Sequence, residues 1–214
     1  MDQGSGGWIQ GLFGLINLGG PVVVVLMLMS VLALTVILLK IAQFMRLKIH
    51  DHAAIDEAMM LWQSGDSQAA LQGLADVKNP AAGVISHAIN GQVKAQLPEP
   101  VLREEVMRQA SEVLQSLRSQ FRTLEVIGTL SPLLGLLGTV LGMIAAFQQL
   151  ESAGARVDPS ILSGGIWVAL TTTAVGLAVA IPVVAVLNGL ERWVDGFRHH
   201  LQDSLTRVFT QAAR

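Results

Sequence analysis

TLSPLLGLLGTVLGMIAAF, residues 129–147, and GIWVALTTTAVGLAVAIP, residues 165–182, are the two stretches that decide the fold. Neither contains an acidic, basic or histidine side chain. A helix rises about 1.5 Å per residue, so roughly 20 residues cross a hydrocarbon core of about 30 Å. Both stretches therefore predict membrane-spanning helices.

Small side chains recur at helical spacing in both stretches. The rows are Gly135, Gly138, Gly142 and Ala145 in the first, and Gly165, Ala169, Thr173, Gly176 and Ala180 in the second. Small faces in lipid allow close helix packing or line a pathway. Thr139 and Thr173 each fall about ten to twelve residues into their spans, which predicts similar depths near the middle of the membrane. A purely structural interpretation, in which both hydroxyls bond to their own helix, stays open on this pattern.

A third apolar run lies earlier in the chain. Residues 21–39, PVVVVLMLMSVLALTVILL, are closed by Lys40 and predict the first membrane helix. Gly19, Gly20 and Pro21 predict a break before it. The segment ahead of that break fits an amphipathic helix at the membrane surface, since it has no basic residue and so lacks the features of a secretory signal.

The predicted segments follow from these runs and from the polar sequence between them. In chain order they are a periplasmic interfacial amphipathic helix at 1–20, transmembrane helices at 21–42, 125–150 and 163–190, a cytoplasmic helical domain at 43–124, a periplasmic loop at 151–162 and a cytoplasmic C-terminal helix at 191–214. Most Lys and Arg residues lie between Lys40 and Arg122 or after the last span, which predicts a periplasmic N-terminus and a cytoplasmic C-terminus.

Two amphipathic helices are predicted outside the membrane. One runs over 101–124, and its packing stripe consists of Leu102, Val106, Ala110, Val113 or Leu114, Leu117 and Phe121. The other continues the third span toward the C-terminus, and its stripe consists of Trp193, Phe197, Leu201, Leu205 and Phe209.

Composition excludes several classes of function. The chain has 214 residues, of which 51% are hydrophobic and 14% charged, and this balance is typical of a membrane protein. Its net charge of -2 argues against nucleic-acid binding. No cysteine is present, so disulfides and thiolate metal sites are excluded. The sequence assembles no pair of nucleophile and base and no phosphate-binding loop, so we expect neither an enzyme nor a cofactor.

The histidines do not predict a metal site. His50 and His52 lie two positions apart with no third ligand in view, and a solvated segment beside the membrane is the favoured interpretation. His199 and His200 are interpreted as surface residues of the C-terminal helix.

The string PLLGLLGTVLGMIAAF (132–147), followed by DPSILSGGIWVALTTTAVGLAVAIP (158–182) and then Asn188, resembles the MotA/TolQ/ExbB family of proton-channel subunits, and in particular its ExbB/TolQ branch. The resemblance covers the layout of the whole chain and, in detail, about residues 124–190. It implies an all-α membrane protein with three transmembrane helices, long cytoplasmic helical extensions and a ring-forming homo-oligomer, expected to be a pentamer.

The resemblance also assigns roles to single residues. The pore-lining threonines of the proton pathway fall on Thr139 and Thr173. The small residues expected on the pore face are Gly135, Gly138, Gly142, Ala169 and Gly176, and the residues expected to form kinks or structural contacts are Pro132, Pro182 and Asn188. The family's glutamate in the second motif falls on Val168, so the carboxylate is expected from a partner.

The function implied is that of a subunit of an inner-membrane motor driven by the proton-motive force. Its ring would surround the transmembrane helices of an ExbD/TolR-like single-span partner that carries a membrane aspartate. A TonB/TolA-like protein and membrane lipid are the further partners implied. The motor would energise outer-membrane transport or envelope maintenance, and the alternatives are a non-conducting membrane scaffold or a stator-like motor for another process.

Overall fold

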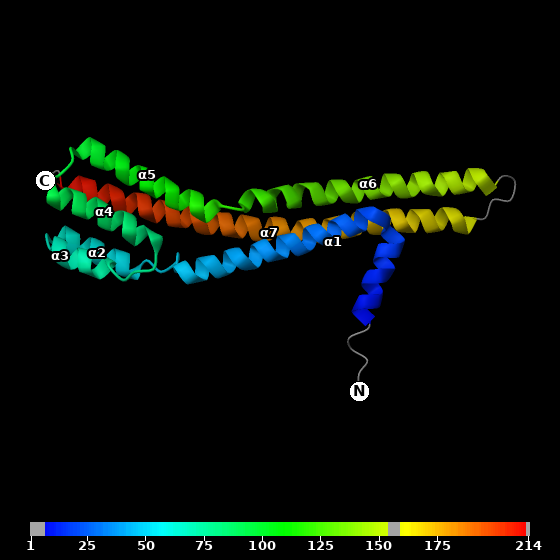
Figure 1. Ribbon diagram of the computed structural model, residues 1–214, viewed down its shortest axis with the longest axis horizontal. Helices are drawn as coiled ribbons and strands as arrows, with labels where there is room; N and C mark the ends of the chain where they lie inside the picture. Colours follow the sequence, from blue (N-terminus) through cyan, green and yellow to red (C-terminus); the bar gives the residue numbers. More distant parts are fainter. Residues whose placement is uncertain (1–6, 154–158, 213–214) are drawn as a thin grey trace, which may run out of the picture. The chain divides into compact units, whose positions relative to one another are not determined.

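The computed structural model describes residues 7–153 and 159–212, which form seven helices and no strand (Figure 1). The helices are α1 (Gly7–Leu47), α2 (Ala53–Gln63), α3 (Ser67–Leu74), α4 (Pro80–Lys94), α5 (Glu99–Arg118), α6 (Phe121–Ala153) and α7 (Pro159–Ala212). The predicted all-α fold is confirmed. Residues 1–6 of the predicted interfacial helix and 154–158 of the predicted periplasmic loop lie outside the described ranges.

The chain divides into two compact units. The apolar unit comprises Met1–Ile37 and Gln120–Leu187, and the polar unit comprises Leu38–Ser119 and Asn188–Arg214. The helix α7 contributes to both, because it runs without interruption from Pro159 to Ala212. The predicted continuation of the third span into the C-terminal helix is therefore confirmed.

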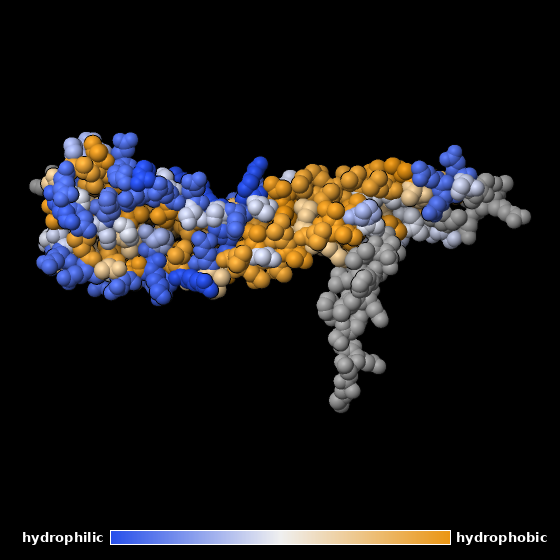
Figure 2. Space-filling view, in the orientation of Figure 1, coloured by the Kyte–Doolittle hydropathy of each residue, from blue (hydrophilic) through white to orange (hydrophobic). Residues whose placement is uncertain are grey.

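The helices of the apolar unit expose large hydrophobic side chains. The described residues contain three helices that are long and apolar enough to cross a membrane, with apolar windows in Gly20–Leu47, Glu99–Ser152 and Leu162–Thr210. Hydrophobic residues form a broad band over the visible face of this unit (Figure 2). Leu28, Leu136 and Leu170, for example, are 67%, 58% and 62% exposed. Such a surface is stable in lipid but not in water, so the chain is a multi-pass membrane protein.

The helix α1 consists of two helical parts separated by a kink at Gly20. The backbone of Gly20 has φ 60° and ψ -157°, a region that L side chains rarely adopt. Pro21 follows and lacks the N–H that a continuous helix would need. The predicted break is therefore present at the predicted position. Beyond it, Val23, Leu26 and Ala33 lie buried along one face.

Both long helices of the apolar unit contain an internal proline. Pro132 lies inside α6 and Pro182 inside α7, and each helix is assigned without a break through its proline. A proline in a helix interior leaves one carbonyl without its usual N–H donor. A kink at either position remains a prediction.

The polar unit has a core of large side chains. Its helices pack in the pairs α2 with α3, α3 with α4 and α4 with α5. Most of the predicted stripe on α5 is confirmed, since Leu102, Val106, Ala110 and Leu117 are buried, whereas Val113 and Leu114 are half-buried. On α7 the buried residues of the predicted stripe are Phe197, Leu201, Leu205 and Phe209, whereas Trp193 is 40% exposed.

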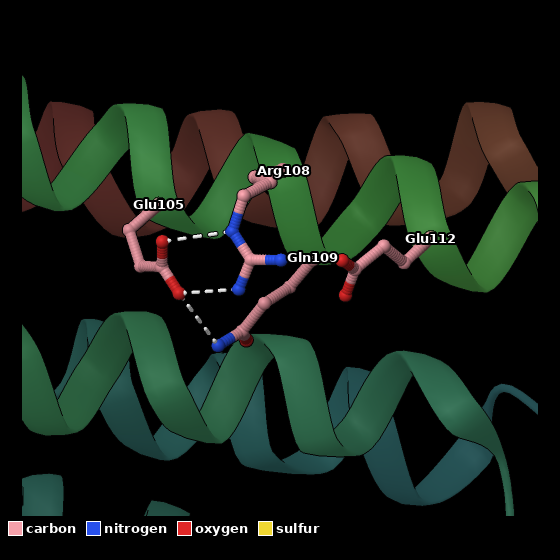
Figure 3. A network of polar contacts seen from close by, with 4 residues as sticks. All are labelled: Glu105, Arg108, Gln109 and Glu112. Atoms are coloured by element: carbon pink, nitrogen blue, oxygen red, sulfur yellow. Dashed lines mark hydrogen bonds and ion pairs between the residues drawn. The ribbon is translucent and has the colours of Figure 1, made fainter.

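The outer face of α5 carries a network of charged side chains (Figure 3). The Arg108 guanidinium donates to both carboxylate oxygens of Glu105, at 3.0 and 2.7 Å, and it also pairs with Glu112. Gln109 donates to Glu105 at 3.4 Å. The bond from Arg108 lowers the pKa of the Glu105 carboxyl, and the same contact raises the pKa of Arg108. This exposed network is typical of a helix face in water.

The prediction of one helix over 101–124 is wrong. The helix α5 ends at Arg118, α6 begins at Phe121, and Gln120 between them has φ 68°. The buried Lys40 ammonium donates to the carbonyls of Ser116 and Leu117 in the last turn of α5, at 3.5 and 3.2 Å. A cation satisfies the carbonyls that a helix leaves unpaired at its C-terminus, so it stabilises the end of α5 here.

Candidate functional site

The predicted site lies where glycines of α6 and α7 bring the two backbones into close contact. A Cβ atom placed on Gly176 would lie 2.6 Å from the Ser131 carbonyl oxygen and 3.1 Å from the Gly135 Cα. A Cβ atom on Gly135 would lie 3.0 Å from the Thr172 carbonyl oxygen. These neighbours are backbone atoms, which cannot rotate out of the way as a side chain can. Glycine at both positions therefore sets the distance between the helices.

The other small residues of the predicted set continue this contact. A Cβ on Gly138 would lie 2.6 Å from the Thr172 hydroxyl oxygen, and one on Gly142 would lie 3.4 Å from Ala169. The five residues predicted to face a pore thus all lie in the contact between α6 and α7 of one chain, where Gly135 meets Gly176, Gly142 meets Ala169 and Gly138 meets Thr172. Their role in lining a pore remains a prediction.

Hydroxyl groups bond to backbone carbonyls within this contact. The Thr173 hydroxyl donates to the Gly135 carbonyl at 3.3 Å, so it reaches from α7 to α6. The Thr139 hydroxyl, one turn further along α6, instead donates to the Leu136 carbonyl of its own helix at 2.6 Å, so it does not bridge to α7. A hydroxyl that donates its proton keeps its lone pairs for accepting a bond. In this structure both predicted pathway threonines are therefore acceptors toward any further group.

Thr172 is the residue of this site that sequence reasoning missed. Its side chain is 1% exposed and donates to the Ala169 carbonyl at 2.7 Å and to the Gly135 carbonyl at 3.3 Å. Thr171 instead bonds to Trp167 of its own helix, at 2.8 Å. Three consecutive threonines point in directions about 100° apart on a helix. Nothing in the run itself shows which of them meets α6. We call Gly135, Gly138, Thr139, Thr172 and Thr173 the threonine seam.

A hollow borders Gly142 of α6 and Val168 of α7. The cavity measures about 710 Å³, and its lining includes Gln149, Ser163 and Val168. Serine and glutamine supply its polar atoms, and none of the lining side chains in the described part of the chain is charged. The position at which the resemblance expects a glutamate is therefore occupied by an apolar residue that borders this hollow.

Ionisable groups begin outside the two small-residue stretches. Glu125, ahead of the first stretch, pairs with Arg122 at 2.9 Å. Asn188, at the end of the apolar part of α7, is exposed, and its structural role remains a prediction. Over residues 7–153 and 159–212, no group of three or more His, Asp or Glu side chains is placed to hold a metal ion. The seam can therefore offer hydroxyls and carbonyls, but no titrating group of its own.

Comparison with known proteins gives one consistent result. A sequence model of the MotA/TolQ/ExbB proton channel family matches residues 76–203, more than half of the chain. The biopolymer transport protein exbB1 of Vibrio cholerae is 39% identical over 122 residues, which cover 47% of this chain and 54% of that protein. A putative biopolymer transport protein, the ExbB homolog of Methanothermobacter thermautotrophicus, is 32% identical over 143 residues, 66% of this chain and 48% of that protein.

A further relative matches over most of its length. The putative biopolymer transport protein ExbB-like 3 of Synechocystis is 28% identical over 172 residues, which are 79% of this chain and 80% of that protein. By contrast, the chain spans about half the length of the Vibrio and Methanothermobacter proteins.

Proposed function

The chain belongs to the MotA/TolQ/ExbB proton channel family, and on this premise we propose that it is an ExbB-like subunit of a proton-driven motor in the bacterial inner membrane. Copies of the chain form a ring, expected to be a pentamer, around the single-span helices of an ExbD/TolR-like partner. That partner supplies the membrane aspartate. The motor energises outer-membrane transport or envelope maintenance, in keeping with a channel-type family and not an enzyme family.

The observation that carries this proposal is the bonding of the threonine seam. Two hydroxyls, those of Thr172 and Thr173, converge on the Gly135 carbonyl in a region without any acid, base or histidine. A polar patch of this kind can bind a proton carrier but cannot itself release a proton near neutral pH. The carrier must therefore come from another chain, and Val168 in place of the family's glutamate supports the same conclusion.

The seam can serve both protonation states of a partner carboxyl group. A charged carboxylate is unfavourable in an apolar ring, so the group crosses protonated and neutral. The O–H of the neutral acid donates a hydrogen bond to a lone pair of Thr173 or Thr139. The hydroxyl of each threonine meanwhile donates to a backbone carbonyl. When the acid ionises, the hydroxyl rotates away from its carbonyl and donates to the carboxylate.

Magnitudes favour this rotation. A hydrogen bond between membrane helices contributes about 0.6 kcal/mol on average. A hydrogen bond to a charged group contributes about 1.5–3 kcal/mol. The hydroxyl therefore donates to the carboxylate when the acid is ionised, and to the backbone carbonyl when the acid is neutral. Each proton that crosses also releases about 2.3 kcal/mol per 100 mV of membrane potential, which drives the cycle in one direction.

Proton flux into vesicles that contain the reconstituted complex tests this proposal. Thr173→Val keeps the shape of the side chain but removes its donor and acceptor, and we expect flux to fall about 10- to 100-fold, as follows from the loss of a bond of about 1.5–3 kcal/mol. Thr173→Ser should retain flux. Thr171→Val is the matched control, because the Thr171 hydroxyl bonds only within α7 among the described contacts, and it should conduct as wild type.

The contrary results are equally specific. Wild-type flux in assembled Thr173→Val rings would show that the seam only packs helices. Absence of flux in the wild-type complex, with the ring assembled, would favour the alternative of a non-conducting scaffold. We expect Val168→Glu to be tolerated, because the hollow beside Val168 has room and polar neighbours for a carboxyl group.

A further inference from the structure

Histidines from two distant segments gather at one place in the polar unit. Of the five histidines in the chain, His50 and His52 come from the connection between α1 and α2, and His199 and His200 come from α7. All four border a cavity of about 470 Å³. Because this grouping joins segments far apart in the sequence, neither histidine pair predicts it alone. We call these four residues the histidine cluster.

Direct contacts hold the two sides of the cluster together. The rings of His52 and His200 stack with centroids 4.1 Å apart and an angle of 13° between their planes. His200 Nε2 lies 3.0 Å from a carboxylate oxygen of Asp56 on α2. His50 packs edge-on against Trp193 of α7, with centroids 4.7 Å apart. Imidazole rings thus join the start of α2 to α7.

A second proton in this stack is unfavourable. A proton on His200 would be paired with Asp56, but a proton on His52 would then face a cation at ring-stacking distance. His52 is also the N-cap of α2, where the positive end of the helix dipole opposes a further positive charge. Its Nδ1 is buried without a hydrogen-bond partner. Burial, and then the neighbouring His200, lower the pKa of His52.

The surrounding acids are engaged with other cations. Asp51, beside His52, lies 3.7 Å from Lys48, and Asp203 on α7 lies 2.8 Å from Arg207. Asp56 is occupied by His200. Arg192 and His199, also on α7, border the same cavity, and the Arg192 guanidinium brings a permanent positive charge to it. These groups leave His52 with little compensation for a positive charge.

We propose that the histidine cluster is a pH-sensitive latch, which holds the α1–α2 connection on α7 while its rings are neutral and releases it when its surroundings acidify. In the predicted topology those surroundings are the cytoplasm. The latch joins the polar extensions of two membrane helices, since α1 leads into the connection and α7 also carries Thr173. This inference does not depend on proton conduction through the seam.

The chain lacks cysteine, which makes distance measurements between two introduced labels straightforward. Ala53→Cys at the start of α2 and Gln202→Cys on α7 are exposed positions, and neither substitution changes the charge. Spin labels at both sites in the full-length protein, held in nanodiscs, report the separation of α2 from α7 by pulsed electron resonance. Between pH 7.5 and 5.5 we expect the ratio of open to closed populations to rise about tenfold, the value for one histidine of ordinary pKa that cannot protonate when closed.

Two variants connect the change to the cluster. His52→Phe keeps a stacking ring that cannot take a proton, and it should stay closed at both pH values. His87→Gln changes the one histidine outside the cluster and should open as wild type does. If His52→Phe does not fold, His52→Gln serves the same purpose. A wild-type distance that is the same at both pH values, or an unchanged pH response in a folded His52 variant, would overturn the proposal.

Discussion

The apolar and polar units hold their helices together in opposite ways. In the apolar unit, glycines bring backbone against backbone, hydroxyls bond to carbonyls and large side chains point outward (Figure 2). In the polar unit, large side chains fill the core and charged groups cover the surface. No hydrophobic effect drives apolar side chains out of lipid, so close contact between small residues must hold the membrane helices together. Water drives large apolar side chains into a core.

One residue type therefore has different consequences in the two units. A Cβ atom on Gly176 would meet a backbone carbonyl oxygen at 2.6 Å, whereas a Cβ atom on Gly91 of α4 would meet a methyl group of Leu102 at 2.3 Å. The contact of Gly91 is the shorter one, but a leucine side chain can rotate. The mobility of the neighbour, more than the distance, decides the cost of a substitution.

The largest effect is expected for Gly176→Ala. The added methyl group must push α6 and α7 apart, which we expect to lower the free energy of unfolding by about 3 kcal/mol, the upper end of the range for overpacking, and to abolish proton flux. Gly91→Ala should cost less than Gly176→Ala, because the buried Leu102 side chain can shift where a backbone carbonyl cannot, and alanine favours the helix by about 0.5–1 kcal/mol. Unfolding in mixed micelles, followed by circular dichroism, measures both. Equal losses for the two variants would contradict the comparison.

A smaller effect is expected for Lys40→Met in the polar unit. The substitution keeps an apolar stem but leaves the last carbonyls of α5 without their donor, at a cost of about 2 kcal/mol in the free energy of unfolding. Lys48→Met is the control, because the exposed Lys48 side chain makes only an ion pair with Asp51 at 3.7 Å among the described contacts. The same micelle titration should show little change for this control. A stable Lys40→Met protein would mean that α5 ends without help from the ammonium.

The seam itself should show a still smaller difference in stability. Thr172→Val removes a bond to α6, whereas Thr171→Val removes only a bond inside α7. We expect the first to be less stable than the second by about 0.6 kcal/mol, the average for hydrogen bonds between membrane helices. A double-mutant cycle of Thr172→Val with Thr173→Val would show whether the two hydroxyls share the Gly135 carbonyl cooperatively. Purely additive losses would argue against a shared acceptor.

The smallest effect on stability is expected for Glu105→Gln in the charged network on α5 (Figure 3). The pKa of Glu105 is lowered from 4.5 by Arg108, so its contribution to stability is present above pH 4.5 and is lost as the pH falls below that value. Glu105→Gln should therefore differ slightly from wild type at pH 7 and converge with it in acid. Raising the salt concentration at pH 7 should also reduce the difference. A difference in stability between Glu105→Gln and wild type that grows as the pH falls would contradict this account.

The sequence predicted those features that depend on local pattern. Hydropathy located the three spans, Gly20 and Pro21 located the kink, and the spacing of Leu102, Val106 and Ala110 located the buried face of α5. Each of these signals is contained within a few helical turns. The resemblance to the family rested on two long motifs, residues 132–147 and 158–182, that occur in the right order.

The features that were not predicted depend on contacts between distant residues. The end of α5 is stabilised by Lys40, 77 positions away from Leu117. His200 meets Asp56 across 144 positions, so neither histidine pair revealed the cluster. Thr172 could not be distinguished from Thr171 or Thr173, because the rotation of α7 against α6 depends on which glycines meet which side chains.

The central claim is that this chain surrounds a partner that carries the proton-binding acid. The most direct test is the mass and composition of the complex, extracted gently from its native membrane through a tag on this chain. We predict a homo-oligomeric ring that contains a small single-span protein with an aspartate in its membrane helix. A ring that repeatedly contains this chain alone would contradict the claim and leave the threonine seam as a packing contact.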